Sequence, residues 1–337
     1  MARMLSHNNK ILARYESGTY GSASGLGHWI GYVQNHEPND EETVQTLRNL
    51  GSDDRDVDTF QNTVKRYSGK ITMFPSNWIM LGMALGSMVD SGSPSPYTHT
   101  LSAINGNNSY AFTSGPDNPF ASFTLESSKK AVGTGLNSVR TYNGVVVDNF
   151  TLSLDKGGIA NAEVDYIAQS MVWSSGNTTA LSGTPSIVGY NRPFMWRDFV
   201  VHIPSGTTIP EIQSLRFKVG NKFMAEPEIN GSATIAVPQP TERDYEFEIT
   251  AAATSERMKT FKENYFLGGS TFNAMLYQNV AQITGSRTMA LVMSGCKVTE
   301  MTDPDPLEGV NEYTLMIKPA TVNVPDIQDE IQLYNPW

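Results

Sequence analysis

The chain has 337 residues, enough for two compact domains or one large β domain. Acidic residues outnumber lysines and arginines by 34 to 24, which argues against a protein that binds nucleic acid through clustered cations. The single cysteine, Cys296, excludes an intrachain disulfide and a cysteine-based zinc site. The 28 Gly, 18 Pro, 14 Tyr and 14 Phe residues are typical of a mainly β protein with many turns.

The N-terminal region has little hydrophobic periodicity. Residues 1–27 are polar and rich in Ser, Gly and Tyr, and we expect them to form an arm. A short strand is predicted at 28–34. Residues 35–60 then hold eight acidic residues and two arginines, which predicts a solvated acidic loop that reaches a neighbour. No apolar run is long enough to span a bilayer, and no signal-peptide core is present, so we expect no membrane insertion.

A short helix is predicted over residues 77–88. It follows an alternating strand at 70–74, and Ser76 is the expected N-cap residue. Apolar residues at helical spacing, together with two glycines that permit close packing, indicate that this helix is buried. A further strand is expected at 120–127.

The most regular stretch runs from residue 137 to residue 173. Apolar and polar residues alternate from Val145 to Asp155, a Lys-Gly-Gly turn follows at 156–158, and alternation resumes over 162–169. Two such runs around a short glycine-containing turn predict a long β-hairpin. The face expected to point away from the core is neutral to acidic, and its residues are Asn149, Thr151, Ser153, Asp155, Glu163, Asp165 and Gln169.

The second half of the chain repeats this order of elements. Residues 176–193 are rich in Gly, Ser, Thr and Asn and are the expected linker. The elements predicted after it are strands at 194–203, 214–219 and 245–250, a helix from about residue 255, a strand at 271–278, and a hairpin of 287–301 with 311–318. The repeated order predicts an internal duplication. The domains would then be 28–175 and 194–320, followed by a C-terminal tail at 321–337.

No residue pattern points clearly to catalysis or metal binding. The five histidines are scattered, and an Asp-rich segment at 54–58 lacks the glycine and glutamate that a calcium loop requires. Glu163 and Asp165 share one strand face, an arrangement that a β-type glycoside hydrolase could use. We nevertheless expect a protein that is not an enzyme and has no cofactor and no metal. Cys296 is expected to fill the core.

Three segments resemble the tail tube proteins of long-tailed bacteriophages and related archaeal viruses. They are Tyr20-Gly-Ser before a Trp-Ile-Gly strand, Gly69-Lys-Ile-Thr before a helix, and Arg140-Thr-Tyr-Asn-Gly-Val-Val-Val-Asp-Asn-Phe-Thr-Leu-Ser. This family is related to the inner tubes of contractile tails and to the ring proteins of type VI secretion. The resemblance implies a β-sandwich or half-barrel with one flanking short helix and a long hairpin. The length of the chain, which exceeds that of a minimal tube domain, fits a duplication of this fold within the chain.

The resemblance also implies a function in the virion, with synthesis in the host cytoplasm. Six such domains form a ring, and stacked rings form the conduit through which the genome is ejected. A duplicated chain implies a trimeric ring with pseudo-six-fold symmetry, with a hexameric ring as the alternative. The implied partners are other copies of the chain, the tape-measure protein, viral DNA, and the tail terminator and baseplate proteins.

Two surfaces then receive expected roles. The polar face of the hairpin would line the lumen, since a wall without clustered cations lets DNA slide. Contacts between stacked rings would involve the acidic loop residues Asp40, Glu41, Glu42, Asp53, Asp54, Asp56 and Asp58. Two other readings of the residues stay open: a β-sandwich fibre or adhesin that binds surface carbohydrate, and a jelly-roll glycoside hydrolase.

Overall fold

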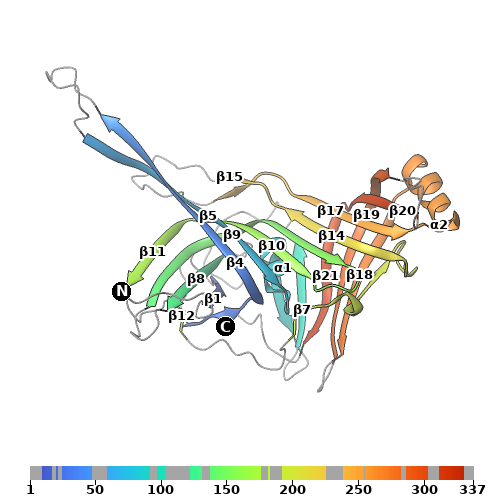
Figure 1. Ribbon diagram of the computed structural model, residues 1–337, viewed down its shortest axis with the longest axis horizontal. Helices are drawn as coiled ribbons and strands as arrows, with labels where there is room; N and C mark the ends of the chain where they lie inside the picture. The colour runs from blue at the N-terminus through green and yellow to red at the C-terminus, as the bar shows by residue number, and fades with distance from the viewer. Residues whose placement is uncertain are drawn as a thin grey trace.

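The computed structural model of the protein is mainly β, with one short buried helix and a second helix at one end of the molecule (Figure 1). Its described residues are 10–16, 20–21, 25–47, 59–91, 97–103, 122–130, 137–175, 181–182, 192–224, 238–253, 255–281, 286–302 and 311–329. Within these ranges, no helix has the length and apolar character needed to cross a membrane.

The elements follow one another as strands with few helical interruptions. In the first part of the chain they are β1 (Lys10–Tyr15), β2 (Gly25–Leu26), β3 (His28–Trp29), β4 (Tyr32–Leu47), β5 (Thr59–Phe74), α1 (Ile79–Leu85), β6 (Gly86–Ser91), β7 (Tyr97–Ala103), β8 (Phe123–Lys130), β9 (Asn137–Asp155), β10 (Asn161–Ala168), β11 (Ser170–Ser175) and β12 (Leu181–Ser182). In the second part they are η2 (Trp196–Asp198), β13 (Phe199–His202), β14 (Ile212–Gly220), β15 (Phe223–Met224), β16 (Gln239–Pro240), β17 (Asp244–Ala252), α2 (Ser255–Thr260), η3 (Phe261–Leu267), β18 (Phe272–Ala281), β19 (Ser286–Thr302), β20 (Glu312–Lys318) and β21 (Thr321–Asp329).

One antiparallel sheet, which we call the central sheet, organises the molecule. Its strand order is β4-β5-β10-β9-β14-β17-β20-β19. The first flanking sheet has the order β3-β1-β8-β9-β11, and the second has the order β13-β18-β19-β21-β7-β6. Strands β9 and β19 each belong to two sheets, because each leaves the central sheet and continues in a flanking one. The three sheets share one hydrophobic core.

The core lies on one face of the central sheet because apolar side chains recur at every second position along its strands. Buried and partly exposed residues alternate along the whole of β10 and β17. On the buried side, Phe150, Phe217 and Phe247 come from three neighbouring strands and are at most 2% exposed. Helix α1 packs against β9, and all of its residues are buried. The opposite face of the central sheet carries the polar residues.

The central sheet contains the same arrangement of four strands twice. The first unit is β4-β5-β10-β9, and the second unit is β14-β17-β20-β19. A helix follows the second strand of each unit, since α1 comes after β5 and α2 after β17. The flanking strands β8 and β18 also pair with β9 and β19 in the same way. This repeated strand order is the one that the sequence predicts for a duplicated chain.

The two units also share their irregularities. The register of β4 against β5 shifts between Val33 and Asn35, and that of β14 against β17 shifts between Ile212 and Ser214. A bulge with the same two-residue step occurs where β9 meets β10 and where β19 meets β20. Because bulges fix a register, these shared steps match the two units residue by residue.

A glycine marks the point where each long strand leaves the central sheet. Gly144 in β9 and Gly295 in β19 have φ angles of 60° and 62°, a conformation that favours glycine. A Cβ atom on Gly144 would lie 2.9 Å from the Cβ of Gln169, and one on Gly295 would lie 3.0 Å from the Cβ of Ala320. The same backbone turn and the same close approach therefore recur in both units.

Three segments that were expected to lie outside the sheets form strands. Residues 10–15 of the expected arm at 1–27 are β1, which pairs with β8. Residues 35–47 of the expected acidic loop at 35–60 belong to β4, which pairs with β5 along its whole length. Residues 321–329 of the expected C-terminal tail are β21, which pairs with β19 and β7. Their polar composition does not predict a strand, and each forms one because a partner strand pairs with it.

The first helix is shorter than predicted. It begins at Ile79 with Trp78 at the N-cap position, so the prediction of Ser76 as the N-cap was wrong. Gly86 ends the helix with a φ angle of 100°, and the chain continues directly into β6. The helix stops there because glycine adopts the left-handed conformation that a side chain would resist.

The two expected domains do not have separate sheets. Strands β6 and β7 come from the first half of the sequence, yet β7 pairs with β21 of the second half. Most of the expected linker at 176–193 lies outside the described residues, except residues 181–182, which pair with β2, and residues 192–193. The domain boundaries therefore remain a proposal, and the pairing of β7 with β21 connects the two halves.

Candidate functional site

The free face of the central sheet gathers most of the polar residues that the sequence placed on the long hairpin. Asn149 lies opposite Asp165, and Thr151 lies opposite Glu163, in neighbouring positions of β9 and β10. Their side chains, like that of Ser153, are partly exposed, whereas the residues between them are buried. Asp155, at the end of β9, is exposed.

Gln169 is the exception among the predicted residues. It lies at the bend between β10 and β11, where its backbone N–H donates to the carbonyl of Asn143 at 3.0 Å. Its side-chain oxygen occupies the space that a Cβ atom on Gly21 would need, so it contacts the N-terminal segment. The bend therefore separates Gln169 from the other six residues.

Cations from neighbouring strands lie on the same face, which sequence reasoning missed. Lys70 of β5 pairs across from Asp165, and Lys218 of β14 pairs across from Thr151. Arg216 of β14 lies opposite Ser153. The polar alternation of residues 214–218 is visible in the sequence, but periodicity cannot reveal which strand lies beside the hairpin. The expectation of a face without cations holds for the hairpin alone.

These cations are flanked by acidic side chains. The Nζ atom of Lys70 lies 2.7 Å from a carboxylate oxygen of Glu163, and this hydrogen bond raises the pKa of Lys70. Lys218 lies 3.8 Å from Glu246, and Arg216 is the cross-strand neighbour of an acid on β17. Both partners of the Lys70 pair are 42% exposed, so the pair adds little stability. Its effect is that the Lys70 ammonium group already has a carboxylate partner. The acids across β9, β10 and β17 are Asp155, Glu163, Asp165, Asp244, Glu246 and Glu248.

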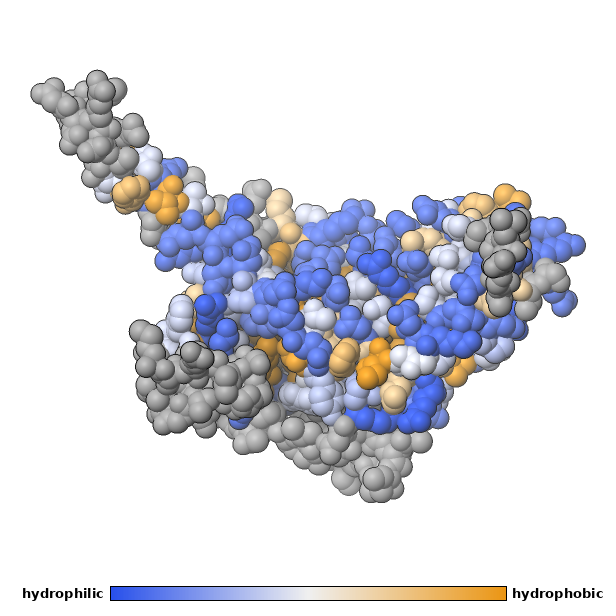
Figure 2. All heavy atoms as spheres, viewed as in Figure 1, coloured by the Kyte–Doolittle hydropathy of each residue, from blue (hydrophilic) through white to orange (hydrophobic). Residues whose placement is uncertain are grey.

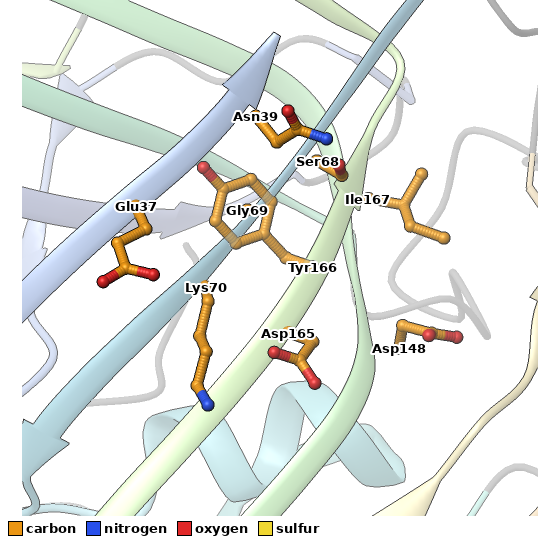
Figure 3. Close-up of a pocket in the computed structure, with 9 residues that line it drawn as sticks. All are labelled: Glu37, Asn39, Ser68, Gly69, Lys70, Asp148, Asp165, Tyr166 and Ile167. Atoms are coloured by element: carbon orange, nitrogen blue, oxygen red, sulfur yellow. The ribbon is translucent and has the colours of Figure 1, made fainter. Parts of the chain in front are cut away.

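Figure 2 shows a mainly hydrophilic band across the middle of the molecule, where Figure 1 places β9, β10, β14 and β17. A shallow cleft of about 320 Å³ opens on this face at the base of β4 and β5. Figure 3 shows Glu37, Lys70 and Asp165 in it, from three adjacent strands. Burial, together with the charges of Asp148 and Glu163, raises the pKa of Asp165. Among the described residues, no group of three His, Cys, Asp or Glu side chains is placed to hold a metal ion.

Strands β4 and β5 form a second feature, a long hairpin that projects from the body of the molecule (Figure 1). We call its outer part, residues 41–47 and 59–66, the β4/β5 arm. Three apolar side chains of the arm are open to solvent: Val44 is 49% exposed, Leu47 is 43% exposed and Phe60 is 66% exposed. Figure 2 shows apolar atoms on this projection. Such side chains on a projecting hairpin indicate a surface for contact with another molecule.

The predicted contact residues on this hairpin divide into three groups. Glu41 and Glu42 are exposed on the arm, where Glu42 lies 3.3 Å from Lys65. Asp40 instead contacts the body of its own chain, since Arg140 and the Tyr142 hydroxyl donate to its two oxygens at 3.3 Å. The residues Asp53, Asp54, Asp56 and Asp58 lie outside the described part of the chain.

The base of the arm is held by an aromatic cluster. A ring nitrogen of His36 lies 2.8 Å from the hydroxyl of Tyr166, and the two rings pack together. Burial, reinforced by Lys129 and Arg140, lowers the pKa of His36 to about 4. The Arg140 guanidinium also stacks 4.6 Å above the ring of Trp173. The arm is therefore anchored at its base while its outer part stays free of the body.

A buried carboxylate, which sequence reasoning also missed, joins the N-terminal strand to the long hairpin. Glu16 is fully buried, and its carboxylate accepts four hydrogen bonds of 2.8 Å. The donors are the backbone N–H groups of Gly21 and Gly144 and the hydroxyls of Ser122 and Thr124. An ionised carboxylate with four donors satisfies the requirement for burying a charge.

We expect Glu16→Gln to destabilise the protein by about 3 kcal/mol, because the amide NH₂ would face donors that then lose their acceptor. Thermal unfolding followed by circular dichroism would measure the loss. The matched control is Glu312→Gln, an exposed residue of β20 at which the same change should shift stability by less than about 0.5 kcal/mol. Equal effects of the two variants would contradict the role of the Glu16 carboxylate.

The protein is mainly β, with a free polar face on its central sheet, a projecting hairpin and an open edge at each end of the central sheet. Neither β4 nor residues 298–302 of β19 pair with a second strand on their outer side among the described residues. The family model described as "Phage tail tube protein" matches residues 6–265, and the chain belongs to this family. The family predicted from the resemblance is thus confirmed.

One solved structure similar to this chain is the SPP1 tail tube, determined by solid-state NMR and cryo EM. The match has 13% sequence identity and a TM-score of 0.33, and covers 42% of this chain and 86% of that chain. No curated protein sequence matches the chain.

Proposed function

We propose that the protein is the major tail tube subunit of a virus, and that its copies close into rings that stack into the conduit for the genome. The observation that carries this proposal is the repeated four-strand unit, whose sheet ends in two open edges, β4 and β19. Open edges pair readily with other strands, and head-to-tail pairing that closes gives a ring. Three chains would supply six units in pseudo-six-fold symmetry; a ring of six chains is the alternative.

The free face of the central sheet is the proposed wall of the lumen. The face opposite to it is buried in the core, so closing the sheet into a barrel with the flanking sheets outside turns the free face inward. Acidic residues predominate on it, and its cations Lys70 and Lys218 have carboxylate neighbours. A wall of this kind offers DNA phosphates few free cations to bind.

The β4/β5 arm is the proposed contact between stacked rings. It projects from the body and exposes apolar side chains together with Glu42, so an adjacent ring would cover them. Glu41 lies at the inner end of the arm, on the open edge of the central sheet. Asp40 has its own intrachain partners and is better placed to position the arm than to bind another ring. The further proposed partners are the tape-measure protein, viral DNA, and the terminator and baseplate proteins. The proposed location is the tail of the virion, after synthesis in the host cytoplasm.

Negative-stain electron microscopy of the purified protein over a range of concentrations tests this proposal. We expect rings with a central hole, and tubes at higher concentration, with three chains per ring by native mass spectrometry. Monodisperse monomers at every concentration, with binding or hydrolysis of glycans, would instead favour one of the carbohydrate-directed functions.

A further inference from the structure

The junction between the two units lies inside the chain and can be described residue by residue. Strands β9 and β14 pair antiparallel there, with Thr151 opposite Lys218 and Asn149 opposite Gly220. Just beyond β14, the side-chain amide of Asn221 donates to the carbonyls of Ala84 and Val147, both at 2.8 Å. The amide thus connects α1 of the first unit, the strand β9 and the second unit.

Helix α1 is buried at this junction. The indole nitrogen of Trp78, at the start of the helix, donates to the side chain of Gln278 in β18 at 2.8 Å. The Trp78 ring also stacks on Phe194, at a centroid distance of 4.8 Å. Both partners come from the second half of the chain. The start of helix α1 is therefore covered in part by residues from the second half of the chain.

The corresponding helix of the second unit has no such cover. The segment formed by α2 and η3 follows β17 as α1 follows β5, and Phe261 and Tyr265 attach it to the core. Most of its other residues are exposed, and Leu267 is 70% exposed. It lies at the opposite end of the molecule from the β4/β5 arm (Figure 1), and Figure 2 shows apolar atoms at that end.

The shared bulges and glycines allow each residue on an open edge to be matched with a residue of the β9·β14 junction. On β19, the bulge opposite β20 gives Glu300 the place of Asn149 and Thr302 the place of Thr151. On β4, the shift against β5 gives Asn39 the place of Lys218 and Glu41 the place of Gly220. The residues of both edges therefore have known equivalents in the β9·β14 junction, and the pairing of those equivalents is known.

We infer that the contact between neighbouring copies of this chain reproduces the internal junction. The edge of β19 pairs antiparallel with β4 of the next copy, with Thr302 opposite Asn39 and Glu300 opposite Glu41, and the next copy covers α2 and η3. This inference rests on the proposed ring and adds its register and its helix contact. It brings two exposed acids, Glu41 and Glu300, together across each contact.

Disulfide trapping tests the register. The double variant Asn39→Cys/Thr302→Cys is compared with Glu41→Cys/Thr302→Cys, in which one partner is moved by two residues. Directly opposed residues of an antiparallel pair lie within disulfide reach, whereas the shifted pair does not. Cys296 is buried and can stay. We expect only the first variant to form covalent oligomers on oxidation. Crosslinking of the shifted pair alone would overturn the register.

Charge exchange gives an independent test at low salt, by measuring the concentration at which rings form. Glu41→Lys and Glu300→Lys each turn a repulsive pair into an attractive one, so each should lower that concentration about threefold per contact. The double variant restores repulsion and should lose the gain. The control is Glu312→Lys, at an exposed residue of β20. Additive gains in the double variant would overturn the register.

Leu267→Asp tests the helix contact. We expect about tenfold weaker ring formation at an unchanged Tm, because the side chain is exposed in the single chain and buried only in the ring. Ile159→Asp, at an exposed residue of the β9–β10 turn, is the matched control and should leave ring formation unchanged. Rings that form normally from Leu267→Asp would overturn the helix contact. Failure of the unmodified chain to form rings at all would instead refute the proposed function.

Discussion

A chain without the outer part of the β4/β5 arm should fold and close into rings but should not stack them into tubes. The variant lacks residues 43–64 and joins Glu42 to Lys65 through an Asn-Gly turn, which suits a two-residue hairpin. It loses three exposed apolar side chains, each contributing about 1.5–3 kcal/mol when buried in a contact. Stacking should therefore weaken on the order of a hundredfold or more. Sedimentation and electron microscopy would separate rings from tubes.

A second variant distinguishes the apolar contact from the length of the arm. Val44→Ser, Leu47→Ser and Phe60→Ser together keep the hairpin intact and remove only its exposed apolar surface. We expect the same loss of stacking with unchanged thermal stability, since these side chains are exposed in the single chain. Tubes of normal length from both variants would show that another surface joins the rings.

Replacing Asp155, Glu163 and Asp165 by lysine should leave tube assembly intact but reduce infectivity by orders of magnitude. The side chains lie on the free face, so the core is not disturbed. Each lysine can bind a phosphate, and the change at Glu163 also releases Lys70 from its carboxylate partner. Contacts repeated along the tube would hold DNA that should slide. Plaque assays, with tube length measured by electron microscopy, test this.

The neutral triple variant, with Asn at the two aspartates and Gln at the glutamate, is the control for this change in the lumen. It removes the same negative charges but adds no cation, so DNA should pass much as before, apart from the effect of freeing Lys70. Normal infectivity of the lysine variant would place this face outside the lumen.

The elements that the sequence revealed are those with a regular internal pattern. The sequence predicts the hairpin of β9 and β10 because apolar and polar residues alternate along both strands, and in β10 the structure shows the matching alternation of buried and partly exposed residues. Strands β14 and β17 and the helix after β17 were found by the same criterion. In each case the apolar residues of one segment recur at the spacing that places them on the core side. This spacing can be read from the segment alone.

The features that the sequence did not reveal depend on neighbours distant in the chain. Strand β4 is rich in acids and resembles a loop until β5 pairs with it. Glu16 looks like a surface residue, yet donors from three separate segments satisfy it in the core. Lys70 and Lys218 reach the polar face only because β5 and β14 lie beside the hairpin. Each of these features depends on which strands are neighbours in the sheet, and the periodicity of a single segment does not reveal its neighbours.

The repeated four-strand unit also has a consequence for the accuracy of assembly. The two units belong to one chain and pair through the β9·β14 junction, so half of the junctions in the proposed closed ring are already made when the chain has folded. Those junctions form at a rate independent of protein concentration. A ring built from whole chains always contains an even number of units. Rings with five or seven units, the nearest errors in diameter, are therefore ruled out by the covalent structure of the chain.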